Sequence, residues 1–161
     1  MPMIRKHSGF TLLEVLVAIV VLSLGLLGLA GLQAASLRNN QTAYYRGIAT
    51  QQAYDMADRL RANLAGVRAG SYNNLAAVIP ADPGCFTTGC PDMAATDHFQ
   101  WNTVNAALLP GGVGTVVCEG GGPGVPCTAA TGNRVFNVTV SWNERTEGGN
   151  AVQNFVTRVS P

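Results

Sequence analysis

One uninterrupted apolar stretch constrains this chain more than any other feature. It runs from Phe10 to Leu32, and Glu14 is its only charged residue. At about 1.5 Å per residue, a helix over this stretch is about 34 Å long, which is enough to cross the hydrocarbon core of a bilayer. A secretory signal peptide fits poorly, because its apolar part is about 7–15 residues long and ends in a small-residue cleavage site. We therefore expect the transmembrane part of a helix at 10–32.

Glu14 does not prevent insertion of this helix. The stretch holds fifteen Leu, Ile, Val or Phe residues, which together favour insertion by about 5–9 kcal/mol, against about 3 kcal/mol for an acid at the centre of a span. An ionisable group inside a span is a functional candidate whose partner should be identified. A cut after Gly9 would create an amino group at Phe10, which is the i,i+4 neighbour of Glu14 on a helix. The amino group of an adjacent copy is a second candidate, and a simple acid near the membrane surface is the alternative.

The residues around Glu14 form a recognisable motif. A short basic segment, Arg5-Lys6-His7-Ser8-Gly9, precedes Phe10-Thr11-Leu12-Leu13-Glu14-Val15. This pattern resembles the leader and cleavage site of type IV prepilins and pseudopilins. The resemblance implies that 1–9 is a leader peptide, cut after Gly9 by an inner-membrane prepilin peptidase that also N-methylates Phe10. It also implies that Glu14 neutralises the amino terminus of a neighbouring subunit during assembly.

Charge sets the expected orientation. Arg5 and Lys6 favour a cytoplasmic amino terminus, so everything after Leu32 is expected in the periplasm of a bacterial inner membrane, and then on a pilus at the cell surface. The whole chain of 161 residues carries a net charge of +1. Without the leader, one net negative charge remains. No nucleic-acid partner is expected from this balance.

The helix continues beyond the membrane. From Gln33 onward, apolar residues recur at helical spacing and form one stripe. The stripe consists of Tyr45, Ala49, Ala53, Met56, Leu60 and Leu64. We expect a single helix over 10–65 that ends near Gly66, with its periplasmic half at 33–65 and the stripe packed on a sheet.

The remainder, 66–161, is expected to form a small globular αβ head. A connector at 67–96 precedes a short helix at 98–109, capped by Asp97, whose apolar face is Trp101, Val104 and Leu108. Strands are expected at 113–118, 135–142 and 151–159, and the last two should pair as an antiparallel hairpin around a polar loop at 143–150. The fold class is therefore α+β, and the resemblance implies a type IV pilin fold, with a long N-terminal helix on a small antiparallel sheet.

Four cysteines lie in the part expected outside the cytoplasm, at Cys85, Cys90, Cys118 and Cys127. An even number there indicates disulfides, and three pairings are possible. We favour Cys85–Cys90 and Cys118–Cys127, because each pair closes a short loop and staples a small core. Zinc is the alternative, but the spacings suit it poorly and no histidine lies nearby, so no metal site is expected.

No catalytic site is expected either. A nucleophile needs a base oriented toward it, and outside the leader the only histidine is His98, which we expect on the surface at a helix start. Asp82, Asp92, Asp97 and Glu119 lie in expected loops without a pairing pattern. The sequence thus predicts a structural subunit that is not an enzyme and needs no cofactor.

Further segments narrow the group of pilin-like proteins that the chain resembles. They are Ser23 to Gln33, Gln100-Trp101, Leu109 to Gly112 and Val138-Thr139-Val140-Ser141-Trp142. These segments look like the minor pilins called PilV, or type IV pilus modification proteins. The resemblance implies a role in priming pilus assembly, and hence in twitching motility and adhesion. The implied partners are other minor pilins, the major pilin, prepilin peptidase and the inner-membrane assembly platform.

Other functions stay open at this stage. A minor pseudopilin of a type II secretion system would carry the same helix. A membrane-anchored adhesin or a DNA-uptake pilin is a third hypothesis, although the head lacks a basic, aromatic-rich patch. A major pilin is a fourth, but the two-cysteine carboxy-terminal loop usual there does not precede Ser160 and Pro161.

Overall fold

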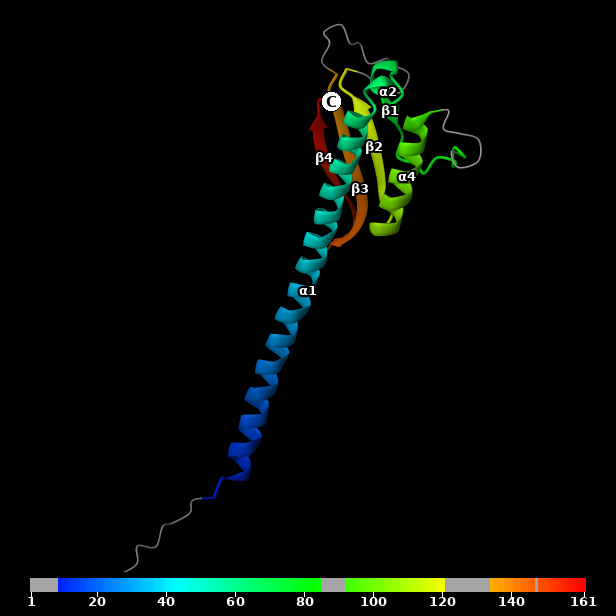
Figure 1. The fold of residues 1–161 in the computed structure, drawn as a ribbon. Coiled ribbons are helices and arrows are strands. Elements are labelled where there is room, and N and C mark those ends of the chain that lie inside the picture. Colours follow the sequence, from blue (N-terminus) through cyan, green and yellow to red (C-terminus); the bar gives the residue numbers. More distant parts are fainter. Residues whose placement is uncertain (1–8, 85–91, 121–133, 147) are drawn as a thin grey trace, which may run out of the picture. The chain divides into compact units, whose positions relative to one another are not determined.

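A computed structural model describes residues 9–84, 92–120, 134–146 and 148–161. The chain divides into two units, which meet between Gln41 and Thr42 and are described separately. The elements are α1 (Leu12–Ala62), α2 (Leu64–Ala69), β1 (Asn74–Leu75), α4 (Met93–Leu108), β2 (Val113–Cys118), β3 (Phe136–Thr146) and β4 (Gly149–Val159), as labelled in Figure 1. A long N-terminal helix packs against a small antiparallel sheet, so the predicted α+β fold class is confirmed.

Helix α1 is shorter at both ends than the predicted helix over 10–65. It begins at Leu12 and ends at Ala62, where Asn63 takes non-helical angles and starts a second helix instead. The Asn63 side chain accepts a hydrogen bond from the Gly66 N–H at 3.0 Å and so caps α2. Helix α2 stops at Gly70, whose left-handed φ of 88° suits a glycine cap. Helical structure therefore continues past the predicted end near Gly66 as far as Ala69, but it is interrupted at Asn63.

From Thr42 onward, α1 lies along the sheet (Figure 1), and residues on one of its faces belong to the buried core. The predicted stripe is confirmed in its central part, because Ala49, Ala53, Met56 and Leu60 are fully buried. Tyr45 is half-buried and packs against the same core. The prediction is wrong for Leu64, which lies in α2 and is exposed.

The sheet has the order β1-β2-β3-β4, and all its described pairs are antiparallel. The predicted strand at 113–118 is confirmed as β2, and the predicted hairpin as β3 and β4. The hairpin strands are longer than expected, because the predicted polar loop at 143–150 continues the ladder as far as the Thr146–Gly149 pair. The face of β3 that enters the core consists of Phe136, Val138, Val140 and Trp142.

Helix α4 differs most from the prediction. It begins at Met93, five residues before the predicted start, with Asp92 as its N-cap; the Asp92 carboxylate accepts from the Ala94 N–H at 2.9 Å. Asp97 is therefore not a cap but a buried residue within the helix. The predicted apolar face is also wrong, because Val104 and Leu108 are exposed, and only Trp101 is buried. The buried residues of α4 are Ala94, Thr96, Asp97, His98, Trp101, Asn102 and Asn105.

Asn102 can occupy this face because β2 offers it a backbone partner. The Asn102 amide accepts from the Gly114 N–H at 2.6 Å and donates to the Gly114 carbonyl at 3.2 Å. The Trp101 ring lies directly over the same glycine, where an added Cβ would be 2.2 Å from the ring. The pattern of apolar residues alone therefore selects the wrong face of α4, since Asn102 is buried by hydrogen bonding.

Candidate functional site

The start of α1 is the candidate functional site, and its local structure is encoded in three residues. Thr11 precedes the first turn, and its hydroxyl accepts from the Glu14 N–H at 3.3 Å. The Thr11 carbonyl also accepts from the Glu14 and Val15 N–H groups, at 3.1 and 3.3 Å. Thr-x-x-Glu is the capping-box sequence, in which an N-cap hydroxyl and an acidic N3 residue begin a helix. Thr11 thus fixes where the helix starts and puts Glu14 in its first turn.

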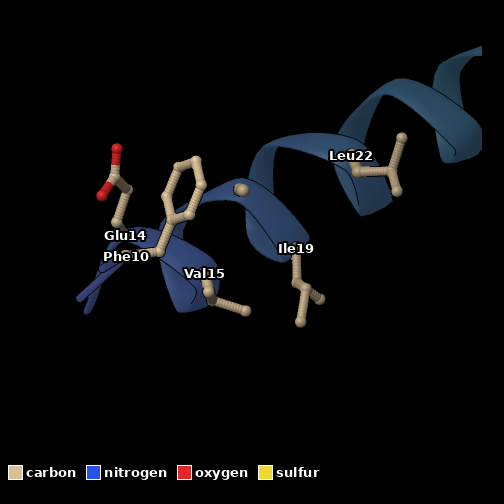
Figure 2. Close-up of a pocket in the computed structure, with 6 residues that line it drawn as sticks. Phe10, Glu14, Val15, Ile19 and Leu22 are labelled. Carbon is tan, nitrogen blue, oxygen red and sulfur yellow. The ribbon is translucent and has the colours of Figure 1, made fainter. Parts of the chain in front are cut away.

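Phe10 lies just outside the helix. It is the residue before the cap and, with Val15, occupies the two positions of a hydrophobic staple. Figure 2 shows the Glu14 carboxylate beside the Phe10 ring, with Val15, Ile19 and Leu22 following along the helix. These residues and Ala18 line one groove of about 470 Å³. The groove is apolar except for the carboxylate at its end.

The predicted cleavage residues lie next to this groove. Gly9 and Phe10 are exposed and outside regular secondary structure. The peptide bond between them is therefore accessible, because no helical hydrogen bond has to break before a protease binds it. In the uncut chain the Phe10 nitrogen is a neutral amide, and only a cut after Gly9 makes it a cation within the neighbourhood of Glu14.

The helix that follows is apolar on every side. Every residue from Gly9 to Gln41 is exposed in the isolated chain, including Leu12 at 83% and Leu29 at 52%. Within the described residues, α1 is the one helix long and apolar enough to cross a membrane. Its most apolar window has no buried residue. Such a surface needs lipid or other apolar helices around it.

A second cluster of polar side chains lies in the unit that begins at Thr42, which is the head as the structure has it and includes the second part of α1. Arg59 on α1 pairs with Asp55 and Asp97, both at 2.9 Å, and the Tyr72 hydroxyl donates to Asp97 at 2.5 Å. Burial lowers the pKa of the Arg59 guanidinium, but its hydrogen bonds to the two carboxylates outweigh this and raise it. Burial and the bond to Asp97 raise the pKa of the Tyr72 hydroxyl. The cluster ties α1 to α4 and the α2–β1 turn, so its role is structural.

Several acidic residues and the head histidine depart from the prediction. Asp97 pairs as above, and Glu119 forms an ion pair with Arg158. His98 is buried, with Nε2 2.9 Å from the Ala76 carbonyl oxygen, so the expected surface position is wrong. The sequence places Asp97 in a loop because the early start of α4 was not foreseen, whereas Glu119 does lie in the turn after β2. In the described part of the chain, no three His, Cys, Asp or Glu side chains gather to hold a metal ion.

The cysteines are tested only in part. Cys118 is buried at the end of β2 and is disulfide-bonded. Cys85, Cys90 and Cys127 lie outside the described residues. The pairings Cys85–Cys90 and Cys118–Cys127 therefore stay predictions.

Thr11 is the functional residue that the sequence argument missed. The signal was present, because Thr11 and Glu14 have the capping-box spacing. The predicted start at Phe10 was taken from the beginning of the apolar stretch, which includes Phe10, and not from the capping residue.

Comparison with known proteins gives one match. Residues 4–30 match the family described as the prokaryotic N-terminal methylation motif. No curated protein and no solved structure matches the chain significantly. The motif, the apolar helix and the small sheet together support a pilin-like or pseudopilin-like protein. Such a motif implies processing by prepilin peptidase, assembly into pilus-like machinery and anchoring in a membrane.

Proposed function

We propose that this chain is a minor pilin of a type IV pilus, a non-enzymatic subunit that helps to prime filament assembly. The observation that carries the proposal is the arrangement at Gly9 to Glu14. An exposed peptide bond directly precedes a capped helix whose stretch up to Leu32 carries one charged group, the carboxylate in its first turn. The segments that resemble PilV, above all Val138 to Trp142, favour a minor pilin over other members of the class.

The chemistry of assembly follows from charge. Prepilin peptidase would cut after Gly9, remove the basic leader 1–9 and methylate the new amino group at Phe10. Glu14 would then lie in the membrane as a lone carboxylate, at a cost of up to about 3 kcal/mol. An amino terminus brought close to it, from the same or a neighbouring subunit, offsets that cost. Pairing between subunits would therefore favour entry into the filament over diffusion in the bilayer.

The other segments of the chain have proposed positions relative to the membrane. Residues 10–32 would cross the inner membrane with the amino terminus in the cytoplasm, since Arg5 and Lys6 lie on that side. Residues 33–65 would continue into the periplasm, and 66–161 would form the head there. The partners would be other minor pilins, the major pilin and the assembly platform.

A deletion strain tests the priming role. Removing the gene should lower the number of surface pili per cell while leaving pilus length unchanged, because starting is impaired and elongation is not. Wild-type protein should restore the number. Electron microscopy of negatively stained cells gives both quantities, together with twitching assays.

The alternative is a minor pseudopilin of a type II secretion system. It would show itself as normal pilus number and twitching combined with loss of protein secretion into the medium. That combination would contradict the assignment to a pilus, but the chain would still be a pilin-like protein.

A further inference from the structure

The outer edge of β4 has no role in the account given so far. β4 lies at one end of the sheet and pairs with β3 alone, so its other edge has no neighbouring strand among the described residues (Figure 1). The pairing with β3 is continuous from Gly149 to Val159. A long strand at the edge of a sheet is a template on which another chain can add a strand.

The hydrogen bonds of β3 show which residues of β4 point outward. In an antiparallel sheet, the backbone groups of successive residues point to opposite neighbouring strands. The Asn143 N–H donates to the Pro110 carbonyl at 2.8 Å, on the β2 side of β3. Trp142, the residue before it, therefore bonds to β4, where it pairs with Gln153. The backbone groups of Gln153 and of every second residue along β4 are thus used by β3, and those of the residues between them face away.

The outward-facing residues of β4 form a regular row of unused backbone groups. They are Asn150, Val152, Asn154, Val156 and Arg158. Within the described residues, no turn, loop or cap bonds to the N–H or C=O groups of this row. Its members repeat every two residues, about 6.8 Å, which is the repeat of a second extended chain. The row therefore matches the backbone of an added strand.

The edge also lacks the features that protect natural edge strands. Proline, bulges and charged side chains usually keep such edges from pairing. The segment 149–159 has no proline, and its unbroken register leaves no bulge. Its one charged residue, Arg158, lies near the end and is paired with Glu119. Val152 and Val156 are 65% and 56% exposed and could pack against the side chains of an added strand.

The direction of β4 restricts which chain can supply that strand. Glu144, near the end of β3, accepts from the Thr42 hydroxyl. Arg134, just before β3, donates to the Val67 carbonyl. β3 therefore runs against the head part of α1, and β4 runs with it. Two copies paired antiparallel through β4 would be turned end for end, so their α1 helices could not enter one membrane in the same direction.

We propose that the outer edge of β4 pairs with an extended segment of a different, neighbouring pilin-like subunit. This inference rests on the proposed function, because assembly is what brings the heads of different subunits together. Backbone hydrogen bonds would provide the affinity, as in other cases of strand addition, and the side chains would provide the selectivity. Opposite Val152 and Val156 the partner segment has small or β-branched apolar residues, and it carries no charge there.

Amide hydrogen exchange tests whether the edge is free. In the full-length protein in detergent micelles, the amides of Val152, Asn154 and Val156 should exchange at least about tenfold faster than those of Gln153 and Phe155, which β3 holds. NMR spectroscopy resolves the individual amides. Equal protection of the two sets would overturn the proposal, because the outward groups would then already have partners.

A proline at position 154 tests the pairing itself. Asn154→Pro removes an outward N–H and leaves the bonds to β3 in place, so the head should stay folded. Asn154→Ala is the matched control, because it removes the same side chain and keeps the N–H. Near-ultraviolet circular dichroism of the full chain in detergent should show the same folded spectrum for both variants.

A photo-crosslinking amino acid at Val156, on the exposed face of β4, reports the contact in cells. It should form an adduct with another pilin-like subunit, identified by mass spectrometry, in the wild-type background and in Asn154→Ala. Asn154→Pro should reduce the adduct by about tenfold or more, because one backbone hydrogen bond is lost and the proline ring projects toward the partner. Equal amounts of adduct in the two variants would overturn the proposal, as would an adduct formed only between two copies of this chain.

The crosslinking result is separable from the proposed function. Normal piliation and complete processing without any adduct at Val156 would overturn the edge pairing and leave the proposed function standing. An adduct that Asn154→Pro removes would support the edge pairing even if deletion of the gene left the number of pili unchanged.

Discussion

Glu14 has two physical roles that a single substitution can confuse. As the N3 residue of a capping box it favours the first turn of α1, and as a charge it is the proposed partner of a processed amino terminus. Glutamine also suits the N3 position but carries no charge. Glu14→Gln therefore removes the second role while keeping the first, and Thr11→Ala does the reverse.

We expect Glu14→Gln protein to be cut and inserted normally but to enter filaments poorly, at one tenth or less of the wild-type amount. Thr11→Ala should destabilise the first turn by about 1 kcal/mol and still be incorporated. Immunoblots of sheared filaments and of membranes measure both. Efficient incorporation of Glu14→Gln, with loss only in Thr11→Ala, would assign Glu14 to helix capping alone.

The contact between α4 and β2 depends on Gly114, a residue without a side chain. Gly114→Ala would put a Cβ 2.2 Å from the Trp101 ring. We expect the head to lose about 1–3 kcal/mol of stability, because the indole is fully buried and is held by its bond to the Gln52 carbonyl. Gly47→Ala is the matched control. Nothing lies within 4 Å of the added Cβ, and Gly47 lies in the interior of helix α1.

Gly47→Ala should raise the stability by about 0.4–1 kcal/mol. Thermal melting of the full chain in detergent, followed by near-ultraviolet circular dichroism, gives the two Tm values. Equal Tm values would mean that the α4–β2 contact is looser than the structure shows.

The same elements show how far sequence reasoning reaches. The apolar stripe through Ala53 and Met56 and the alternation at Val138 and Val140 are periodic, and both predictions are confirmed. The face of α4 was not foreseen, because Asn102 is buried through a bond to the backbone of Gly114. The strand β1 was not foreseen either, because its two residues are a strand only through their pairing with β2. Such long-range pairing has no local signature. The helix start, in contrast, could have been predicted locally, because Thr11 and Glu14 have the capping-box spacing. The apolar run that includes Phe10 pointed to an earlier start.

At the scale of the whole molecule, the two units have opposite surface chemistry. The described residues up to Gln41 are all exposed and mostly apolar, whereas the head has a closed core around α1, α4 and the sheet. The first unit therefore depends on lipid or on other helices, and the head depends on its own packing. Conditions that act on the core can therefore perturb the head alone.

Alkaline pH is one such perturbation. Burial, and then the bond to Asp97, raises the pKa of Tyr72 above its ordinary value of about 10. The protonated form is thus favoured in the folded head. Its contribution to stability is complete below pH 10 and is lost as the pH rises above that value.

We expect the Tm of the wild-type head to fall steeply above pH 10. Tyr72→Phe should have a lower Tm at pH 7 and a shallower decline above pH 10, because it has no proton to lose. Tyr54→Phe, at a position that is 55% exposed, should keep the wild-type slope. An unchanged slope in Tyr72→Phe would show that other groups control alkaline unfolding.

We propose above all that a peptidase frees Phe10, so that its amine and the carboxylate of Glu14 can join one apolar helix to others. Intact-mass and peptide mass spectrometry of protein extracted from membranes and filaments tests this most directly. The account predicts a chain that begins at Phe10 and carries one added methyl group on its amino terminus. A chain that still begins at Met1, in cells whose peptidase processes other prepilins, would contradict it.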